Sequence, residues 1–185
     1  SSTGNASAFV ALLKKLAGGP AEKNAIDNTL KEIVFKAHTL TPNVDGSVDV
    51  SSEGTIKAVK YGTTVCIYTE APVITLNSES HDLFFNFRAL ESVKFNNVNA
   101  QGGAFTNMFQ GCYNLKSVDF GDADFSKVIN MNGMFYLRAG ETDKTNHTLE
   151  SINFGNTATT SATKMVDMFR EAWGLKYLNL GSKFT

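Results

Sequence analysis

Two apolar patterns recur together along the second half of this 185-residue chain, and their shared spacing constrains the fold more than any other feature. The first pattern has apolar residues at its first, fourth and sixth positions. The second has apolar residues at positions i, i+3 and i+4, and it follows each of the first three copies of the first. The leucines that open the first pattern advance by 25, 34 and 26 residues, and the phenylalanines that close the second advance by 26 and 34. Matching steps in two independent patterns indicate an internal repeat.

Each pattern predicts a short element of secondary structure. The first is typical of a short strand with its apolar side chains on one face. The second is typical of one or two helical turns. A strand and a short helix in each unit of about 26 residues predict a leucine-rich-repeat-like solenoid, in which stacked units bury columns of equivalent residues. The predicted columns are Leu90, Leu115, Leu149 and Leu175; Phe95, Phe120, Phe154 and Leu180; Met108, Met134 and Met168; and Phe109, Phe135 and Phe169.

The stretch that ends at Phe135, NMFQGCYNLKSVDFGDADFSKVINMNGMF, carries a family resemblance. It resembles the BspA-like leucine-rich repeats of bacterial surface proteins, in particular the mycoplasma- and lactobacillus-type subgroup. Asp124–Asn130 (DFSKVIN) and Met131–Phe135 match that pattern closely, whereas the third unit keeps only Met-x-x-Met-Phe. The resemblance covers roughly Gly54 to Thr185. It implies a bacterial surface or extracellular module for adhesion, with a protein or a glycan of a host or another cell as its partner.

The first 38 residues predict an N-terminal helical segment. Ala8–Ala17 has apolar residues at helical spacing, and Gly18-Gly19-Pro20 should end the helix. Ala21–Ala37 predicts a second helix, which Pro20 would open. The two helices either fold back onto the chain as a cap or serve self-association through Ala8–Ala37, and the sequence leaves both alternatives open.

Residues 39–82 predict a β-rich capping region with a hairpin around Tyr61-Gly62-Thr63. The expected fold class is therefore α+β, with helices in 1–38, a small β cap in 39–82 and a solenoid of about four units in 83–185. The fourth unit lacks the second pattern, which favours a natural chain that continues beyond Thr185. The strands expected before the repeat are Thr55–Lys60, Val65–Thr69 and Val73–Leu76.

Composition and motifs argue against several classes of function. A net charge of −1 gives no basic surface for nucleic acid. No stretch approaches the ~20 apolar residues of a membrane span, so membrane insertion is not expected. His38, His81 and His147 have no partners at metal-ligand spacing. Catalytic motifs and phosphate-binding glycine loops are also absent from the sequence, so we expect neither an enzyme nor a bound cofactor or metal.

The candidate binding surface follows from strand geometry. Residues between the apolar landmarks of a strand point away from the core, and repeat arrays commonly bind partners on such a face. The insertion Tyr136–His147 is a second candidate, because inserted loops often carry recognition. The N-terminal segment resembles phage fibre proteins. The competing function is therefore that of a tail-fibre or decoration protein of a virion, and this protein would oligomerise through its N-terminal helices. The residues predicted to form the concave binding ladder are Ser92, Lys94, Ser117, Asp119, Ser151, Asn153, Tyr177 and Asn179.

Overall fold

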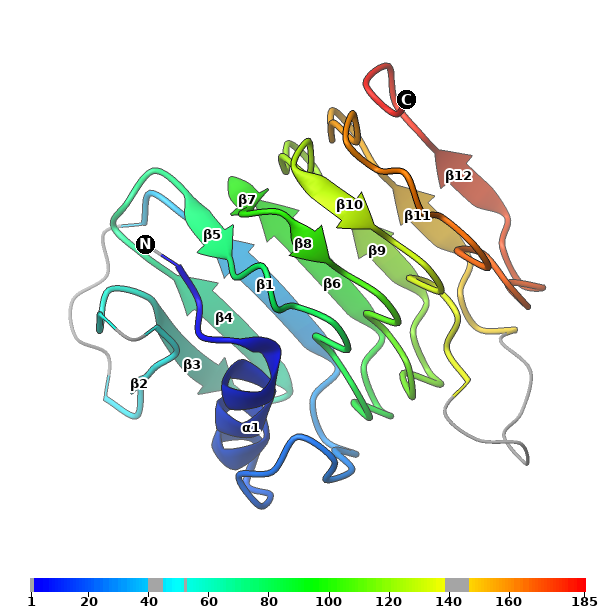
Figure 1. The fold of residues 1–185 in the computed structure, drawn as a ribbon. Helices are drawn as coiled ribbons and strands as arrows, with labels where there is room; N and C mark the ends of the chain where they lie inside the picture. The colour runs from blue at the N-terminus through cyan, green and yellow to red at the C-terminus, as the bar shows by residue number, and fades with distance from the viewer. Residues whose placement is uncertain (1, 40–44, 52, 139–146) are drawn as a thin grey trace.

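The computed structural model describes residues 2–39, 45–51, 53–138 and 147–185, and its largest feature is one mixed sheet of eight strands (Figure 1). The strand order is β12-β11-β9-β6-β1-β4-β3-β2, and the pairs β5-β7 and β8-β10 form two small parallel sheets. The helix of the described part is α1 (Ala6–Ala17). The strands are β1 (Glu32–Lys36), β2 (Val48–Asp49), β3 (Lys57–Tyr61), β4 (Thr64–Tyr68), β5 (Ile74–Leu76), β6 (Ser92–Asn96), β7 (Val98–Ala100), β8 (Gly103–Ala104), β9 (Ser117–Asp119), β10 (Val128–Asn130), β11 (Ser151–Asn153) and β12 (Tyr177–Asn179).

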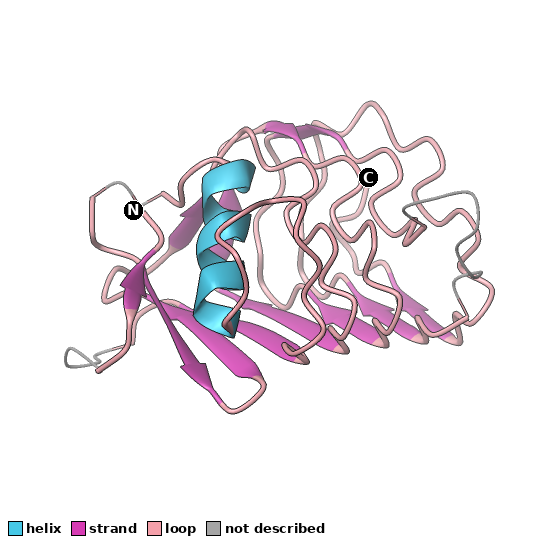
Figure 2. Cartoon of the chain, turned by 90° about the horizontal axis from the view of Figure 1, so that it is seen from below, coloured by secondary structure: helices cyan, strands magenta, loops and turns pink. Residues whose placement is uncertain are grey.

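The repeated units lie side by side in parallel register. From β4 through β1, β6, β9 and β11 to β12, each strand pairs in parallel with the next. Val93 therefore pairs with Val118, Val118 with Ile152, and Ile152 with Leu178. The small sheets lie on the other side of the core from the main sheet (Figure 1), and α1 covers the end near β3 and β4 (Figure 2). Equivalent positions of successive units are thus neighbours in space.

Two stacks of phenylalanine rings fill the space between these layers. In the first stack the ring centroids are 5.0, 4.9 and 4.9 Å apart, and in the second 5.3, 5.7 and 5.5 Å. The phenylalanines of the two predicted columns are confirmed, and each column has one more ring at its N-terminal end than the sequence suggested. Leu180, predicted to continue the first column, is instead 37% exposed, and the ring centroid of Phe184 lies 5.0 Å from that of Phe154. The first stack consists of Phe35, Phe95, Phe120 and Phe154, and the second of Phe84, Phe109, Phe135 and Phe169.

The predicted α+β class is wrong, and so is the leucine-rich-repeat-like solenoid of strands and short helices. The described part is mostly β, and its units contribute strands to a large mixed sheet. The second pattern of each unit forms turns, and in the first two copies several main-chain N–H groups bond to the next unit instead of within a helix. In Met131–Phe135, the N–H groups of Met131, Gly133 and Phe135 donate to carbonyls of residues 164, 166 and 168 at 2.7, 2.9 and 3.0 Å.

The second predicted helix, Ala21–Ala37, is also wrong. Its C-terminal part is strand β1, which lies between β4 and β6 near the middle of the main sheet. The β-branched pair Ile33 and Val34, followed by Phe35, favours a strand once both neighbours are available. The described N-terminal segment therefore contains one helix, α1, and is not rich in helix.

The predicted hairpin is confirmed as the antiparallel pair β3 and β4, which turns at Gly62 with a φ of 58°. The third predicted strand of this region is β5, which pairs in parallel with β7 and not with the hairpin. Buried residues from Ala6 to Met168 form one hydrophobic cluster. The three predicted segments therefore share one core, and their boundaries stay a prediction.

A buried amine holds the end of α1 in place. The amine of Lys14 donates hydrogen bonds to the carbonyls of Lys23 and Ala25 and lies 5.2 Å from the ring centroid of Phe87. Burial lowers the pKa of Lys14 to about 8, although the nearby carboxylate of Asp27 opposes part of this shift. The charged form of Lys14 is therefore less favourable in the folded protein than in the unfolded chain.

This shift predicts a rise in stability at alkaline pH. The unfolded chain keeps the Lys14 proton up to about pH 10.4, whereas the folded protein releases it from about pH 8. At Lys14 the folded state binds fewer protons in that window, so this residue makes a contribution to the free energy of unfolding that increases from about pH 8 to about pH 10. Burial raises the pKa of the Cys112 thiol, which opposes this rise in any variant that keeps Cys112. Urea unfolding of the protein and of Lys14→Met, in parallel, should therefore show a free energy of unfolding that depends more positively on pH in the former. Equal slopes in both proteins would contradict the assignment.

Candidate functional site

The eight residues predicted as a binding ladder lie on one face of the main sheet, here called the polar sheet face. Their strands are in register, so the residues form two rows across β6, β9, β11 and β12, with neighbours about 4.8 Å apart. The structure brings all eight together, and their role in binding stays a prediction. The first row is Ser92, Ser117, Ser151 and Tyr177, and the second is Lys94, Asp119, Asn153 and Asn179.

Much of the second row is engaged in bonds within the protein. The Nδ2 of Asn153 donates to Asp119 Oδ1 at 3.0 Å, and the Nδ2 of Asn179 donates to Asn153 Oδ1 at 2.8 Å. Each of the three side chains also accepts a 3.0 Å bond from the N–H of the glycine two residues later. We call this chain of bonds the amide row. Its bonds from the glycine N–H groups form the same turn at the end of each strand. The first row of the polar sheet face is therefore the better candidate for contact with a partner.

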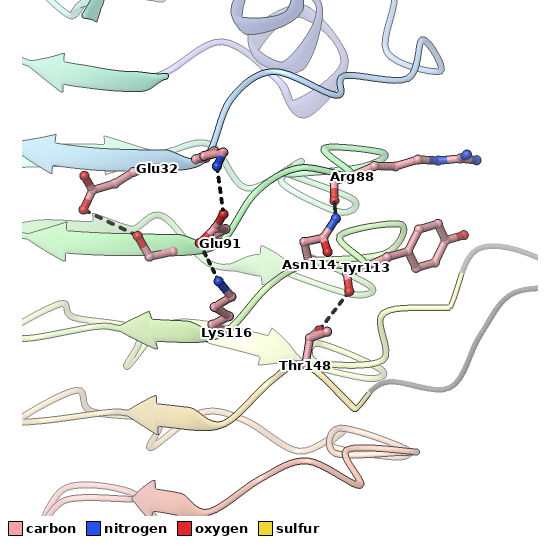
Figure 3. Close-up of polar contacts among 9 residues, drawn as sticks. Glu32, Arg88, Glu91, Tyr113, Asn114, Lys116 and Thr148 are labelled. Atoms are coloured by element: carbon pink, nitrogen blue, oxygen red, sulfur yellow. Dashed lines mark hydrogen bonds and ion pairs between the residues drawn. The ribbon is translucent and has the colours of Figure 1, made fainter. Parts of the chain in front are cut away.

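A ladder of alternating charges borders the first row, just before the strands begin. Lys31 Nζ lies 3.4 Å from Glu91 Oε1, Lys116 Nζ lies 2.7 Å from Glu91 Oε2, and Lys176 Nζ lies 2.8 Å from Glu150 Oε1. Figure 3 shows Glu91 turned toward Lys116, and Glu32 directed at the neighbouring strand. The ladder was not predicted, although the sequence contains one signal of it. The residue after each repeat leucine alternates in charge: Glu91, Lys116, Glu150 and Lys176.

The lysines of the ladder lower the pKa values of its carboxylates. Hydrogen bonds from Lys116 and then Lys31 hold the pKa of Glu91 below its ordinary value, and Lys176 does the same for Glu150. On the polar sheet face itself, the amine of Lys94 donates to Glu32 Oε1 at 2.9 Å and lowers the pKa of that carboxyl. The first row thus lies beside carboxyl groups whose pKa values are held below the ordinary value.

We expect Lys116→Met to raise the pKa of Glu91 toward its ordinary value, because the Lys116 amine is the largest cause of the lowering. Lys31 should keep part of the shift. An NMR titration of the Glu91 side-chain carboxyl measures the change directly. Lys15→Met, at an exposed position on α1, is the control and should leave the Glu91 titration unchanged. A Glu91 pKa that is the same in all three proteins would contradict the ladder.

A hollow of about 490 Å³ lies among the turns of the second pattern, and it is a second candidate site. Its volume is within the range of small-molecule sites. Amide side chains line it, among them Asn107 and Asn132, together with Tyr136. The guanidinium of Arg170 lies 5.2 Å from the Tyr136 ring centroid, and its NH1 nitrogen is 3.2 Å from Asp167 Oδ2. The hollow has the amide, aromatic and charged groups that a polar ligand would need. It was not predicted from the sequence, because turns of three different units form it.

The remaining predictions concern the insertion, metal binding and membrane insertion. Of the insertion Tyr136–His147, residues 139–146 lie outside the described part of the chain. Within the described ranges, no group of three His, Cys, Asp or Glu side chains could hold a metal ion. No helix in the part of the chain that the structure describes is long and apolar enough to cross a bilayer.

The helix expected to serve self-association packs within its own chain. Phe9, Val10 and Leu13 of α1 are fully buried in the hydrophobic cluster of the protein. Association through Ala8–Ala37 stays a prediction, and the apolar stripe that suggested it is already covered.

We compared the chain with protein-family models, with curated proteins and with solved structures, and none of the three comparisons found a match.

Proposed function

We propose that this protein is a non-catalytic binding module that recognises a protein or a glycan through its polar sheet face. The role that fits such a module is adhesion, and its location would be a bacterial cell surface or the space outside the cell. The proposal rests on one observation, the first row of the polar sheet face. Parallel register places Ser92, Ser117 and Ser151 in line, between the charge ladder and the amide row.

The chemistry of this row suits an extended partner. A serine hydroxyl can donate one hydrogen bond and accept others, and the strands repeat these groups about every 4.8 Å. Ser92 Oγ already donates to Glu32 Oε1 at 3.4 Å, so Ser117 and Ser151 are the hydroxyls best able to donate to a partner. The flanking ion pairs offer both signs of charge beside the row. A partner that runs across the strands would therefore meet a serine hydroxyl at each of β6, β9 and β11, beside charges that alternate in sign.

The test is a binding screen with a disrupting variant. The labelled protein is applied to an array of defined glycans and to immobilised mucin, collagen and fibronectin. We expect binding to at least one probe, and a loss of tenfold or more for Ser117→Arg, which places a long cation in the middle of the row. Thr160→Arg adds the same side chain at an exposed position outside the main sheet and should bind normally. Binding to no probe, or equal binding by both variants, would contradict the proposal.

A further inference from the structure

The repeat itself builds the hollow among the turns of the second pattern. Three equivalent positions from each of three successive units line it, and the middle unit has a described neighbour on both sides. The N–H of Asn107 donates to the carbonyl of Asn132 at 3.0 Å, and that of Gly133 donates to the carbonyl of Val166 at 2.9 Å. The turns that follow β8 and β10 therefore lie side by side (Figure 1). The three columns of the lining are Thr106, Asn132 and Val166; Asn107, Gly133 and Asp167; and Gln110, Tyr136 and Arg170.

A glycine in the middle unit leaves the hollow open. All three residues of the second column have a positive φ, which is 51° for Asn107, 61° for Gly133 and 56° for Asp167. Asparagine, aspartate and glycine tolerate this conformation better than other residues do, so the backbone alone does not require glycine in the middle. A Cβ at Gly133 would lie 2.4 Å from Asn107 Oδ1. The missing side chain therefore leaves room beside the Asn107 amide, which a side chain like those of the neighbouring units would occupy.

The polar groups around this room are available to a ligand. Within the described part of the chain, the side chains of Thr106, Asn107 and Gln110 make no hydrogen bond to another residue. The lining contains one acid and one base, and they pair with each other, since Arg170 NH1 lies 3.2 Å from Asp167 Oδ2. The hollow thus combines unbonded amide and hydroxyl groups with a net charge of zero.

We propose that this hollow binds a single neutral sugar ring. Amide and hydroxyl groups both donate and accept hydrogen bonds, as the adjacent hydroxyls of a sugar do. The ring of Tyr136 supplies apolar surface for the C–H groups of the sugar, and its hydroxyl adds another polar group. The volume of about 490 Å³ is within the range of small-molecule sites. This site does not depend on the polar sheet face, because its residues come from turns outside the main sheet.

The test is an NMR titration that follows the side-chain amide signals of Asn107 and Gln110. The probes are the methyl glycosides of glucose, galactose, mannose, N-acetylglucosamine and N-acetylgalactosamine, with methyl glucuronide as the charged counterpart of methyl glucoside. Gly133→Asn fills the hollow with the side chain that the preceding unit has at this position. Gly62→Asn is the matched control, because Gly62 has a φ of +58° and a Cβ there would have no atom within 4 Å. Gln110→Ala, which removes one amide from the lining, is a second variant.

We expect at least one neutral glycoside to bind with a dissociation constant of about 5 mM or lower, which a few hydrogen bonds are enough to provide. Gly133→Asn should weaken this binding tenfold or more, and Gln110→Ala about threefold. Gly62→Asn should bind as the unmodified protein does. Ser117→Arg should do so as well, which separates this proposal from the function proposed for the polar sheet face.

Three results would overturn the proposal. The first is that no neutral glycoside shifts the two amide signals at about 50 mM. The second is equal binding by Gly133→Asn and Gly62→Asn or, should circular dichroism show Gly133→Asn unfolded, unchanged binding by Gln110→Ala. The third is tighter binding of methyl glucuronide than of methyl glucoside, because the ligand would then be an anion.

Discussion

Phe120→Ala is expected to lower the free energy of unfolding by about 4 kcal/mol, within the range for large-to-small changes in a packed core. Phe120 is fully buried, and its ring stacks on those of Phe95 and Phe154 with centroids 4.9 Å away on each side. It also makes edge contacts with Phe125 and Phe135 at 5.4 and 6.2 Å. Each aromatic pair contributes about 0.5–1.5 kcal/mol beyond the area that it buries. The substitution therefore opens a cavity and interrupts the first ring stack at its centre.

Urea denaturation followed by circular dichroism measures this loss. Tyr177→Ala is the matched control, because it removes an aromatic side chain that is 53% exposed on β12. We expect the control to change the free energy of unfolding by less than about 1 kcal/mol. Similar losses in the two variants would show that the ring of Phe120 is not in a packed stack.

Gly155→Ala is expected to cost about 3 kcal/mol or more. The φ of Gly155 is +54°, and a Cβ at this residue would lie 2.2 Å from the carbonyl oxygen of Gly121 in the preceding unit. The left-handed conformation alone costs an L-residue roughly 1–2 kcal/mol. The contact adds an overpacking cost of about 1–3 kcal/mol, since the atom in the way is backbone and both units are held by the sheet.

Gly62→Ala separates these two costs. Gly62 has a φ of +58°, and a Cβ there would have no atom within 4 Å. We expect it to lose only the conformational part, about 1–2 kcal/mol. Thermal unfolding of both variants should place Gly155→Ala well below Gly62→Ala in melting temperature. Equal melting temperatures would contradict the close approach of neighbouring units at the ends of their strands.

The sequence predicted the parts of the fold that depend on local periodicity. Helix α1, the β3–β4 hairpin and the strand in each unit follow from apolar residues at the spacing of one helix face or one sheet face. The helical interpretation of Met131–Phe135 failed because periodicity cannot tell whether N–H groups bond within a segment or to a neighbour. Strand β1 was missed for a related reason. Its partners β4 and β6 begin 32 and 60 residues later in register, so nothing local specifies the pairing.

The candidate site was also predictable from the sequence only in part. The two rows of the polar sheet face were predictable, because side chains alternate across a strand and the units share one register. The charge ladder was not predicted, since a single lysine or glutamate in each unit resembles ordinary solvated surface. The pairing of Glu91 with Lys116 becomes informative only when the strands are placed side by side. The hollow beside Tyr136 depends on side chains from three turns, and no single unit contains its pattern.

The proposed binding face depends on the parallel register of β9 and β11, and disulfide trapping tests that register most directly. Ser117 and Ser151 are register partners, at a Cα separation of about 4.8 Å, which a disulfide can bridge. Ser117 and Asn153 lie on the same face but two positions apart, beyond the reach of about 7 Å for that bond. After mild oxidation, we expect peptide mapping to find a 117–151 cross-link in the double cysteine variant Ser117→Cys, Ser151→Cys. An equal or greater yield from Ser117→Cys, Asn153→Cys would contradict it.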